Sequence, residues 1–217
     1  MLCHSSGGMT AAGVGAKAGD VPGDGRRPAP GRPAIEYYKR VPVQVREPDP
    51  RSPAVAARLA GLIARAVPDL QAEHVGSSAV PNLAGKGTID LLLPTPAERI
   101  PAVTGTLVRL GFQRQSIPQR FPDSRPMLQG VLRHGRRRYR VHLHIVPDPS
   151  PEIKELRGFR DALCVDAALR RDYEQLKRDI VARGLTDSVE FTEAKRDFIV
   201  GALRRLGLRG RESDEER

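Results

Sequence analysis

The sequence has no tryptophan, only two cysteines and few aromatic residues, which make up 4% of its 217 positions. Cys3 and Cys164 are too few for a disulfide framework or a cysteine-rich zinc site, which favours a reducing compartment. No apolar run approaches the roughly 20 residues that a membrane-spanning helix needs. A signal-peptide pattern is also missing, because the first basic residue is Lys17 and no continuous apolar stretch follows it. We therefore expect a cytoplasmic protein without membrane association.

Basic residues are in excess, with 36 Lys and Arg against 26 Asp and Glu and a formal net charge of +10. This balance favours anionic partners such as nucleotides, nucleic acid or phosphorylated metabolites. A solvated basic surface explains the charge equally well. A composition of 39% hydrophobic and 29% charged residues is typical of a globular protein, and the length suits one domain. We expect a disordered leader over residues 1–34, a domain over residues 35–208 and a disordered tail over residues 209–217.

Hydrophobic periodicity predicts strands and helices throughout that domain. Strands are expected over residues 35–45, 70–75, 88–93, 112–115, 125–134 and 137–146. Helices are expected from an N-cap at Ser52, from Thr95-Pro96 to a stop at Gly111, and over residues 153–164, 167–183 and 190–206. The strand at 88–93 is almost continuously apolar, which indicates a position in the middle of a mixed sheet. The predicted fold class is α/β (α+β).

The turn Gly76-Ser77-Ser78 follows the strand at 70–75. Glycine lets the backbone approach a ligand closely, and the hydroxyl and N–H groups after it can donate to phosphate oxygens. An ordinary turn is the simpler explanation when the motif is considered alone. The stretch that ends at Gly85-Lys86 is not a P-loop, because Val80 stands where the first glycine is required and Gly87 where Ser or Thr is required.

One carboxylate and two histidines are candidates for a metal or phosphate site. Asp90 lies inside the apolar strand at 88–93, where a carboxylate needs a cation or several hydrogen bonds. His142 and His144 project from the same face of their strand, together with Arg138 and Arg140. If the two strands are neighbours, the three residues form a mixed nitrogen and oxygen site of transition-metal type. Packing of the histidines under the helices, or a structural role for Asp90, is the alternative.

Basic side chains form two further groups of candidates. Arg160, Lys177 and Lys195 lie on predicted helices and could line a cleft, although exposed helix charges are commoner than ligands. The second group is the turn between the last two strands, with Arg133, Arg136, Arg137, Arg138 and Arg140. A solvated hairpin tip is favoured there over a nucleic-acid surface, because only Tyr139 supplies an aromatic ring for stacking.

These motifs together resemble the GrpB-like family, which is assigned to the nucleotidyltransferase superfamily. The matching segments are residues 73–83, Lys86 with Ile89-Asp90, residues 142–146, residues 159–161, Tyr173 with Leu176-Lys177, and residues 191–195 with Phe198. They occur in the family's order over about three quarters of the chain. The resemblance implies a nucleotidyltransferase-like mixed sheet with flanking helices, and a C-terminal helical part that forms the other wall of a cleft.

The resemblance also implies chemistry, in which the Gly-Ser turn holds a triphosphate and three carboxylates bind Mg²⁺ for phosphoryl transfer. Asp90 takes the first carboxylate position, but Leu92 takes the second, and the two histidines stand where the third is expected. Smaller departures are Ser78 for Thr, Asn82 for Gly and Gly87 for Pro, the last of which is expected to loosen the loop.

We therefore expect a cleft that binds a nucleotide or another phosphorylated small molecule, with divalent-metal-dependent nucleotidyl or phosphoryl transfer as its activity. Asp90, His142 and His144 would hold Mg²⁺, Mn²⁺, Zn²⁺ or a phosphate, and a nucleoside triphosphate would be the substrate. Gly76, Ser77 and Ser78 would bind phosphate, and further anion contacts would come from Lys86, Arg140, Arg160, Lys177 and Lys195. The alternatives are a non-catalytic nucleotide-binding module, a histidine-based phosphohydrolase, and an RNA-binding protein that uses the arginine-rich hairpin.

Overall fold

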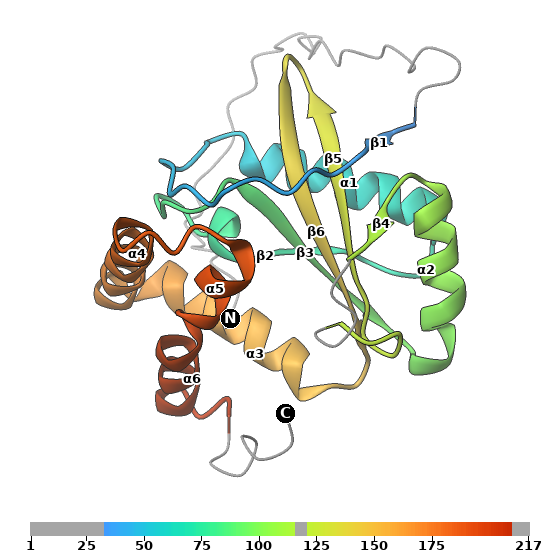
Figure 1. The fold of residues 1–217 in the computed structure, drawn as a ribbon. Coiled ribbons are helices and arrows are strands. Elements are labelled where there is room, and N and C mark those ends of the chain that lie inside the picture. The colour runs from blue at the N-terminus through green and yellow to red at the C-terminus, as the bar shows by residue number, and fades with distance from the viewer. Residues whose placement is uncertain (1–32, 116–120, 210–217) are drawn as a thin grey trace, which may run out of the picture. The chain divides into compact units, whose positions relative to one another are not determined.

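A computed structural model describes residues 33–115 and 121–209 (Figure 1). The predicted leader and tail fall outside these residues, apart from positions 33, 34 and 209. Among the described residues, no helix is both long enough and apolar enough to cross a membrane. The cytoplasmic location stays a prediction.

A mixed sheet lies at the centre of the described domain (Figure 1). Its strands are β1 (Ile35–Glu36), β2 (Glu73–Val75), β3 (Thr88–Thr95), β4 (Gln113–Arg114), β5 (Met127–His134) and β6 (Arg137–Pro147). The order is β1-β5-β6-β3-β2, and β4 pairs with β5. Strands β3 and β6 are parallel, whereas the other pairs are antiparallel. The predicted mixed sheet and the central place of residues 88–93 are confirmed.

The β5–β6 hairpin is confirmed, and Gly135 at its turn has a φ of 57°. Strand β6 has the predicted two faces. Its apolar side chains, Tyr139, Val141, Leu143 and Ile145, are buried in the main core. His142 and His144 point to the opposite side and line a cleft.

Helices cover both faces of the sheet. They are α1 (Ser52–Ala66), α2 (Ile100–Arg109), α3 (Pro151–Val165), α4 (Ala167–Ala182), α5 (Ser188–Glu193) and α6 (Arg196–Arg205). The main core packs α1 and α2 on the apolar face of β3, β5 and β6. On the other face, Leu92 packs with Ile153 of α3. The α/β class is therefore confirmed, with the helices after β6 gathered together on one side of the sheet (Figure 1).

The predicted boundaries of the first and last helices are wrong, and the strand expected over residues 35–45 is limited to Ile35–Glu36. Arg51 occupies the N-cap position of α1 without a capping side-chain hydrogen bond, and Ser52 is the first helical residue. The single helix expected over residues 190–206 is divided into α5 and α6, because the N–H of Lys195 bonds Thr192 three residues back and interrupts the regular helical ladder. Helix α5 also begins earlier than expected, since the Asp187 carboxylate caps it by accepting from the Val189 N–H.

Candidate functional site

A cleft of about 1750 Å³ lies between the polar face of the sheet and the helices that follow β6. Ten of the eleven predicted site residues line it: Gly76, Ser77, Ser78, Lys86, Asp90, His142, His144, Arg160, Lys177 and Lys195. The structure thus brings together the turn after β2, the middle of the sheet and the helical wall. Arg140 lies beside the cleft and donates to the Lys86 carbonyl oxygen at 3.1 Å.

The Gly-Ser corner is built around a glycine with a φ of 70°. A Cβ on Gly76 would lie 2.7 Å from Asp90 Oδ2, so only glycine allows the corner to sit against the carboxylate. Ser77 and Ser78 form a short turn of 3₁₀ helix directly after it. His74 Nε2 lies 2.9 Å from Ser78 Oγ, so the second hydroxyl is held by a ring from β2.

Asp90 and His142 are direct neighbours, as the sequence predicted for adjacent strands. They are paired in the parallel register of β3 and β6, and Asp90 Oδ1 lies 3.3 Å from His142 Nδ1. Lys86 Nζ lies 3.5 Å from the same ring nitrogen. Burial opposes ionisation of Asp90, but the Lys86 ammonium and the hydrogen bond from His142 hold its pKa below the usual range. Burial lowers the pKa of His142 to about 4, so the ring is uncharged at neutral pH.

His144 is placed one register step further along and pairs with Leu92 instead of Asp90. Its ring contacts the edge of Phe121 at a centroid distance of 6.2 Å. An ion pair between Arg125 and Glu152 lies close enough to influence its charge, and burial lowers its pKa. His144 therefore belongs to a second group of side chains at one end of the cleft.

The donor set does not suit the metal site that the resemblance implies. Within residues 33–115 and 121–209, no three His, Cys, Asp or Glu side chains are arranged to hold one metal ion. Leu92, at the second carboxylate position, is fully buried against Val75 and Ile153. Mg²⁺ prefers several oxygen ligands, and Asp90 is the one carboxylate available at this position. The three-residue site of Asp90, His142 and His144 stays a prediction, while Asp90 and His142 form a pair.

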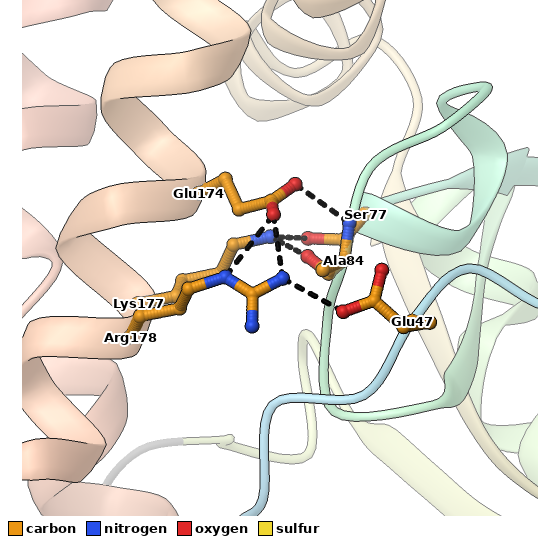
Figure 2. A network of polar contacts seen from close by, with 6 residues as sticks. All are labelled: Glu47, Ser77, Ala84, Glu174, Lys177 and Arg178. Carbon is orange, nitrogen blue, oxygen red and sulfur yellow. Dashed lines mark hydrogen bonds and ion pairs between the residues drawn. The ribbon is translucent and has the colours of Figure 1, made fainter.

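Helix α4 contacts the loop between β2 and β3 through the side chain of Lys177 (Figure 2). This side chain is 1% exposed, donates to the carbonyl oxygen of Ala84 and lies 3.3 Å from Ser77 Oγ. Its ammonium also lies 4.7 Å above the centre of the Tyr173 ring. Burial lowers the pKa of Lys177 to about 7, and the charge of Lys195 acts in the same direction. Lys177 is thus a buried cation directly behind Ser77.

Glu174 and Arg178, one turn apart on α4, complete this attachment (Figure 2). The Glu174 carboxylate accepts the Ala84 N–H at 3.0 Å, so α4 bonds both backbone groups of Ala84. Arg178 pairs with Glu174 at 2.7 Å and with Glu47 at 2.9 Å. The loop between β2 and β3 is therefore fixed to the helical wall by backbone contacts.

The remaining basic candidates differ in their partners. Arg160 donates to the His74 carbonyl oxygen at 3.1 Å, and Lys195 Nζ lies 4.6 Å from the centre of the Phe191 ring. At the hairpin tip, three arginines are paired with carboxylates. Arg133 and Arg138 contact Glu36, and Arg137 contacts Asp49. These pairs favour a solvated hairpin tip over a nucleic-acid surface.

Sequence patterns missed two aromatic members of the site. The Tyr38 hydroxyl lies 3.3 Å from His142 Nε2, which completes a chain of contacts from Asp90 through His142 to Tyr38. Tyr173 lies under the Lys177 ammonium and stacks on Phe198 at 5.5 Å. The partner of Tyr38 is distant in sequence. Tyr173 lies one helical turn from Lys177, in a segment that matched the family, but the sequence assigned it no role in the site.

The comparisons with known proteins agree with this architecture. The model of the GrpB protein family matches residues 42–205. A UPF0157 protein of Pseudomonas aeruginosa is 33% identical over 170 residues, covering 75% of this chain and 67% of the relative. The crystal structure of GrpB from Enterococcus faecalis is 24% identical with a TM-score of 0.62, and the match covers 76% of this chain and 97% of that one. A Cid1 poly(U) polymerase structure matches at 14% identity and a TM-score of 0.43, over 61% of this chain and 41% of that one.

Proposed function

The chain belongs to the GrpB family, and from this premise we propose that it binds a nucleotide or a similar phosphorylated small molecule in its cleft. The phosphate groups would lie at Gly76, Ser77 and Ser78, where hydroxyl and backbone N–H groups can donate to their oxygens. The observation that carries the proposal is the buried Lys177 ammonium behind Ser77, because a buried cation is best stabilised by an anion.

The size of the cleft supports a ligand larger than inorganic phosphate. Typical ligand pockets measure roughly 300–1,000 Å³, and this cleft measures about 1750 Å³. It therefore has room for a nucleotide and a second molecule. Lys195 and Arg160, which also line it, would add positive charge for a chain of phosphates.

The side chains available for metal binding favour a module that binds a nucleotide without catalysing its transfer. Phosphoryl transfer by two metal ions needs several carboxylates to hold the metals that stabilise the attacking and leaving oxygens, whereas this cleft presents Asp90 with Leu92 in the second position. Metal-dependent transfer remains the expectation that the family resemblance supplies.

Calorimetric titration with the four common nucleoside triphosphates tests the proposal. We expect saturable binding of at least one of them, weakened at least about tenfold by Ser77→Ala. Thr106→Ala, which removes a hydroxyl from helix α2 outside the lining of the cleft, is the control and should leave affinity unchanged. Absence of binding to every nucleotide by the folded native protein would contradict the proposal.

A further inference from the structure

We propose that the Lys86 ammonium takes the place of a divalent cation beside Asp90, so that the cleft binds nucleotide phosphates without a metal ion. This inference rests on the proposed function, because it concerns how the same cleft balances the charge of its ligand. It is carried by the surroundings of the Asp90 carboxylate, by the absence of a second carboxylate in the same row of the sheet, and by the way the loop holds Lys86.

The Asp90 carboxylate has close protein neighbours on two sides. Oδ1 lies 3.3 Å from His142 Nδ1, and an uncharged imidazole at this distance can donate its ring N–H to the carboxylate. Oδ2 faces the Gly76 turn so closely that an added Cβ there would lie 2.7 Å away. A metal ion at Asp90 would therefore share the carboxylate with His142 and would have little room on the side of Gly76.

The row of paired residues that contains Asp90 holds no second acidic side chain. Asp90 is paired with Val75 on β2 and His142 on β6, and His142 is paired with Gln129 on β5. This row across four strands holds one negative side chain. In the next row, Glu73 is opposite Leu92, but its carboxylate accepts two hydrogen bonds from Arg157. The oxygen-rich cage that Mg²⁺ needs is not formed by these rows.

Lys86 is held beside the carboxylate by a loop that is fixed at several points. Arg140 donates to the Lys86 carbonyl oxygen, and the backbones of Gly85 and Arg46 exchange two hydrogen bonds of 2.8 and 3.0 Å. Gly87 has a φ of 67°, a conformation that proline cannot adopt. The departure from proline at this position therefore fits the observed turn and does not loosen it, contrary to our expectation from the sequence.

The charges favour an ammonium over an added metal. Lys86 and Asp90 together are close to neutral, and Arg160 is paired with Asp161 at 2.8 Å. Lys177 and Lys195, which also line the cleft, would balance the phosphates. A divalent ion next to Lys86 would be repelled by its positive charge at short range. Arg140 then acts by positioning Lys86 and not by contacting the ligand.

Titration of ATP by calorimetry, with excess EDTA and in parallel with excess MgCl₂, tests the inference. We expect native dissociation constants that agree within about threefold between the two conditions. Lys86→Met should weaken binding in EDTA by at least about tenfold. Lys154→Met, which removes an exposed lysine on α3, is the matched control and should change neither value.

The outcomes separate this inference from the proposed function. Native binding that requires Mg²⁺ would overturn the inference and leave the proposed function intact, whereas no binding of ATP or any other nucleoside triphosphate in either condition would overturn both. Electron paramagnetic resonance of Mn²⁺ added to the nucleotide-free protein gives an independent result. We expect no bound Mn²⁺ in the native protein, and stoichiometric binding that Asp90→Asn abolishes would contradict the inference.

If Lys86→Met is too unstable for binding measurements, melting temperatures still test the inference. The double variant Lys86→Met with Asp90→Asn removes both charges and should melt at a higher temperature than Lys86→Met alone, because it leaves no unbalanced carboxylate at this partly buried position. Equal melting temperatures for the single and double variants would show that Lys86 does not balance Asp90, and would overturn the inference.

Discussion

Two lysines hold the loop between β2 and β3, and their surroundings differ. Lys86 Nζ lies 3.5 Å from the same nitrogen of the uncharged His142 ring that contacts Asp90, and its charge lowers the pKa of that carboxylate. Within the described part of the chain, Lys177 donates only to the neutral oxygens of Ser77 and Ala84. Burial therefore lowers the pKa of Lys177 to about 7, while the pKa of Asp90 is held below its usual range beside Lys86. The comparison indicates a charge pair on the sheet and a pH-sensitive cation on the helix.

The largest loss of stability and of nucleotide binding should follow from a substitution at the Gly-Ser corner. Gly76→Ala introduces a Cβ that meets Asp90 Oδ2 at 2.7 Å, at a residue with a φ of 70°. We expect the free energy of unfolding to fall by roughly 2–4 kcal/mol, and nucleotide binding to be lost. Urea denaturation measures the first result and calorimetry the second.

Gly61→Ala is the control for this substitution, because the added Cβ would meet only Arg65 Nη1 at 3.8 Å within helix α1. It should leave stability unchanged or raise it by up to about 1 kcal/mol. Equal stability of the Gly76→Ala and Gly61→Ala variants would show that Asp90 does not need the close approach of the corner.

The second effect is a pH dependence on the helix side. The pKa of Lys177 is about 7 in the folded protein, against an ordinary value of 10.5 for lysine, so between these values the unfolded chain binds a proton that the folded chain does not. The free energy of unfolding therefore rises with pH in this window. Relative to Lys177→Met, the native protein should gain roughly 2 kcal/mol between pH 7 and pH 9.

Chemical denaturation of both proteins at several pH values measures this gain. Taking the difference between the native protein and the variant cancels the titration of groups that they share. A difference that stays flat from pH 7 to pH 9 would mean that Lys177 keeps its proton in the folded state, and the contrast between the two lysines would disappear.

A smaller difference in stability is expected between substitutions of Glu174 and Arg178 on α4. Glu174→Ala removes the acceptor of the Ala84 N–H, and we expect a loss of about 1 kcal/mol. Arg178→Ala removes ion pairs of a side chain that is 40% exposed, and should cost only about 0.2–1 kcal/mol, less at high salt. Thermal unfolding at low and high salt ranks them, and a larger loss for Arg178→Ala would indicate that the ion pairs hold the loop.

The smallest effect is expected at the hairpin tip. Arg136→Ala removes a positive charge from the turn between β5 and β6, far in sequence from the Gly-Ser corner, and should change ATP affinity by less than about twofold at physiological salt. Binding to a single-stranded RNA, measured over a range of salt concentrations, should likewise be weak. A steeply salt-dependent RNA affinity that Arg136→Ala reduces would favour the nucleic-acid alternative.

Local patterns were enough to predict most elements of this fold. The alternation along β6 predicted which side chains enter the core and which face the cleft, because the two-residue period of a strand leaves no other choice. Asn82, which stands where the family has glycine, also follows a local rule. Its φ of 58° is one that asparagine tolerates and glycine favours.

Contacts between distant segments could not be predicted in this way. Asp90 and His142 are neighbours because β3 and β6 pair in a parallel register. The sequence alone did not show that these two strands are adjacent. Lys177 is 100 positions from Ser77, and a lysine on a helix is usually exposed. Its burial depends on how α4 packs against the loop, which no local pattern encodes.

Phosphate binding at the Gly-Ser corner is tested most directly by nuclear magnetic resonance of the backbone amides during titration with tripolyphosphate in EDTA. We expect the amides of Gly76, Ser77 and Ser78 to shift most, in a saturable manner, together with that of Lys86. Shifts confined to the arginine-rich hairpin tip, with these four amides unchanged, would contradict it.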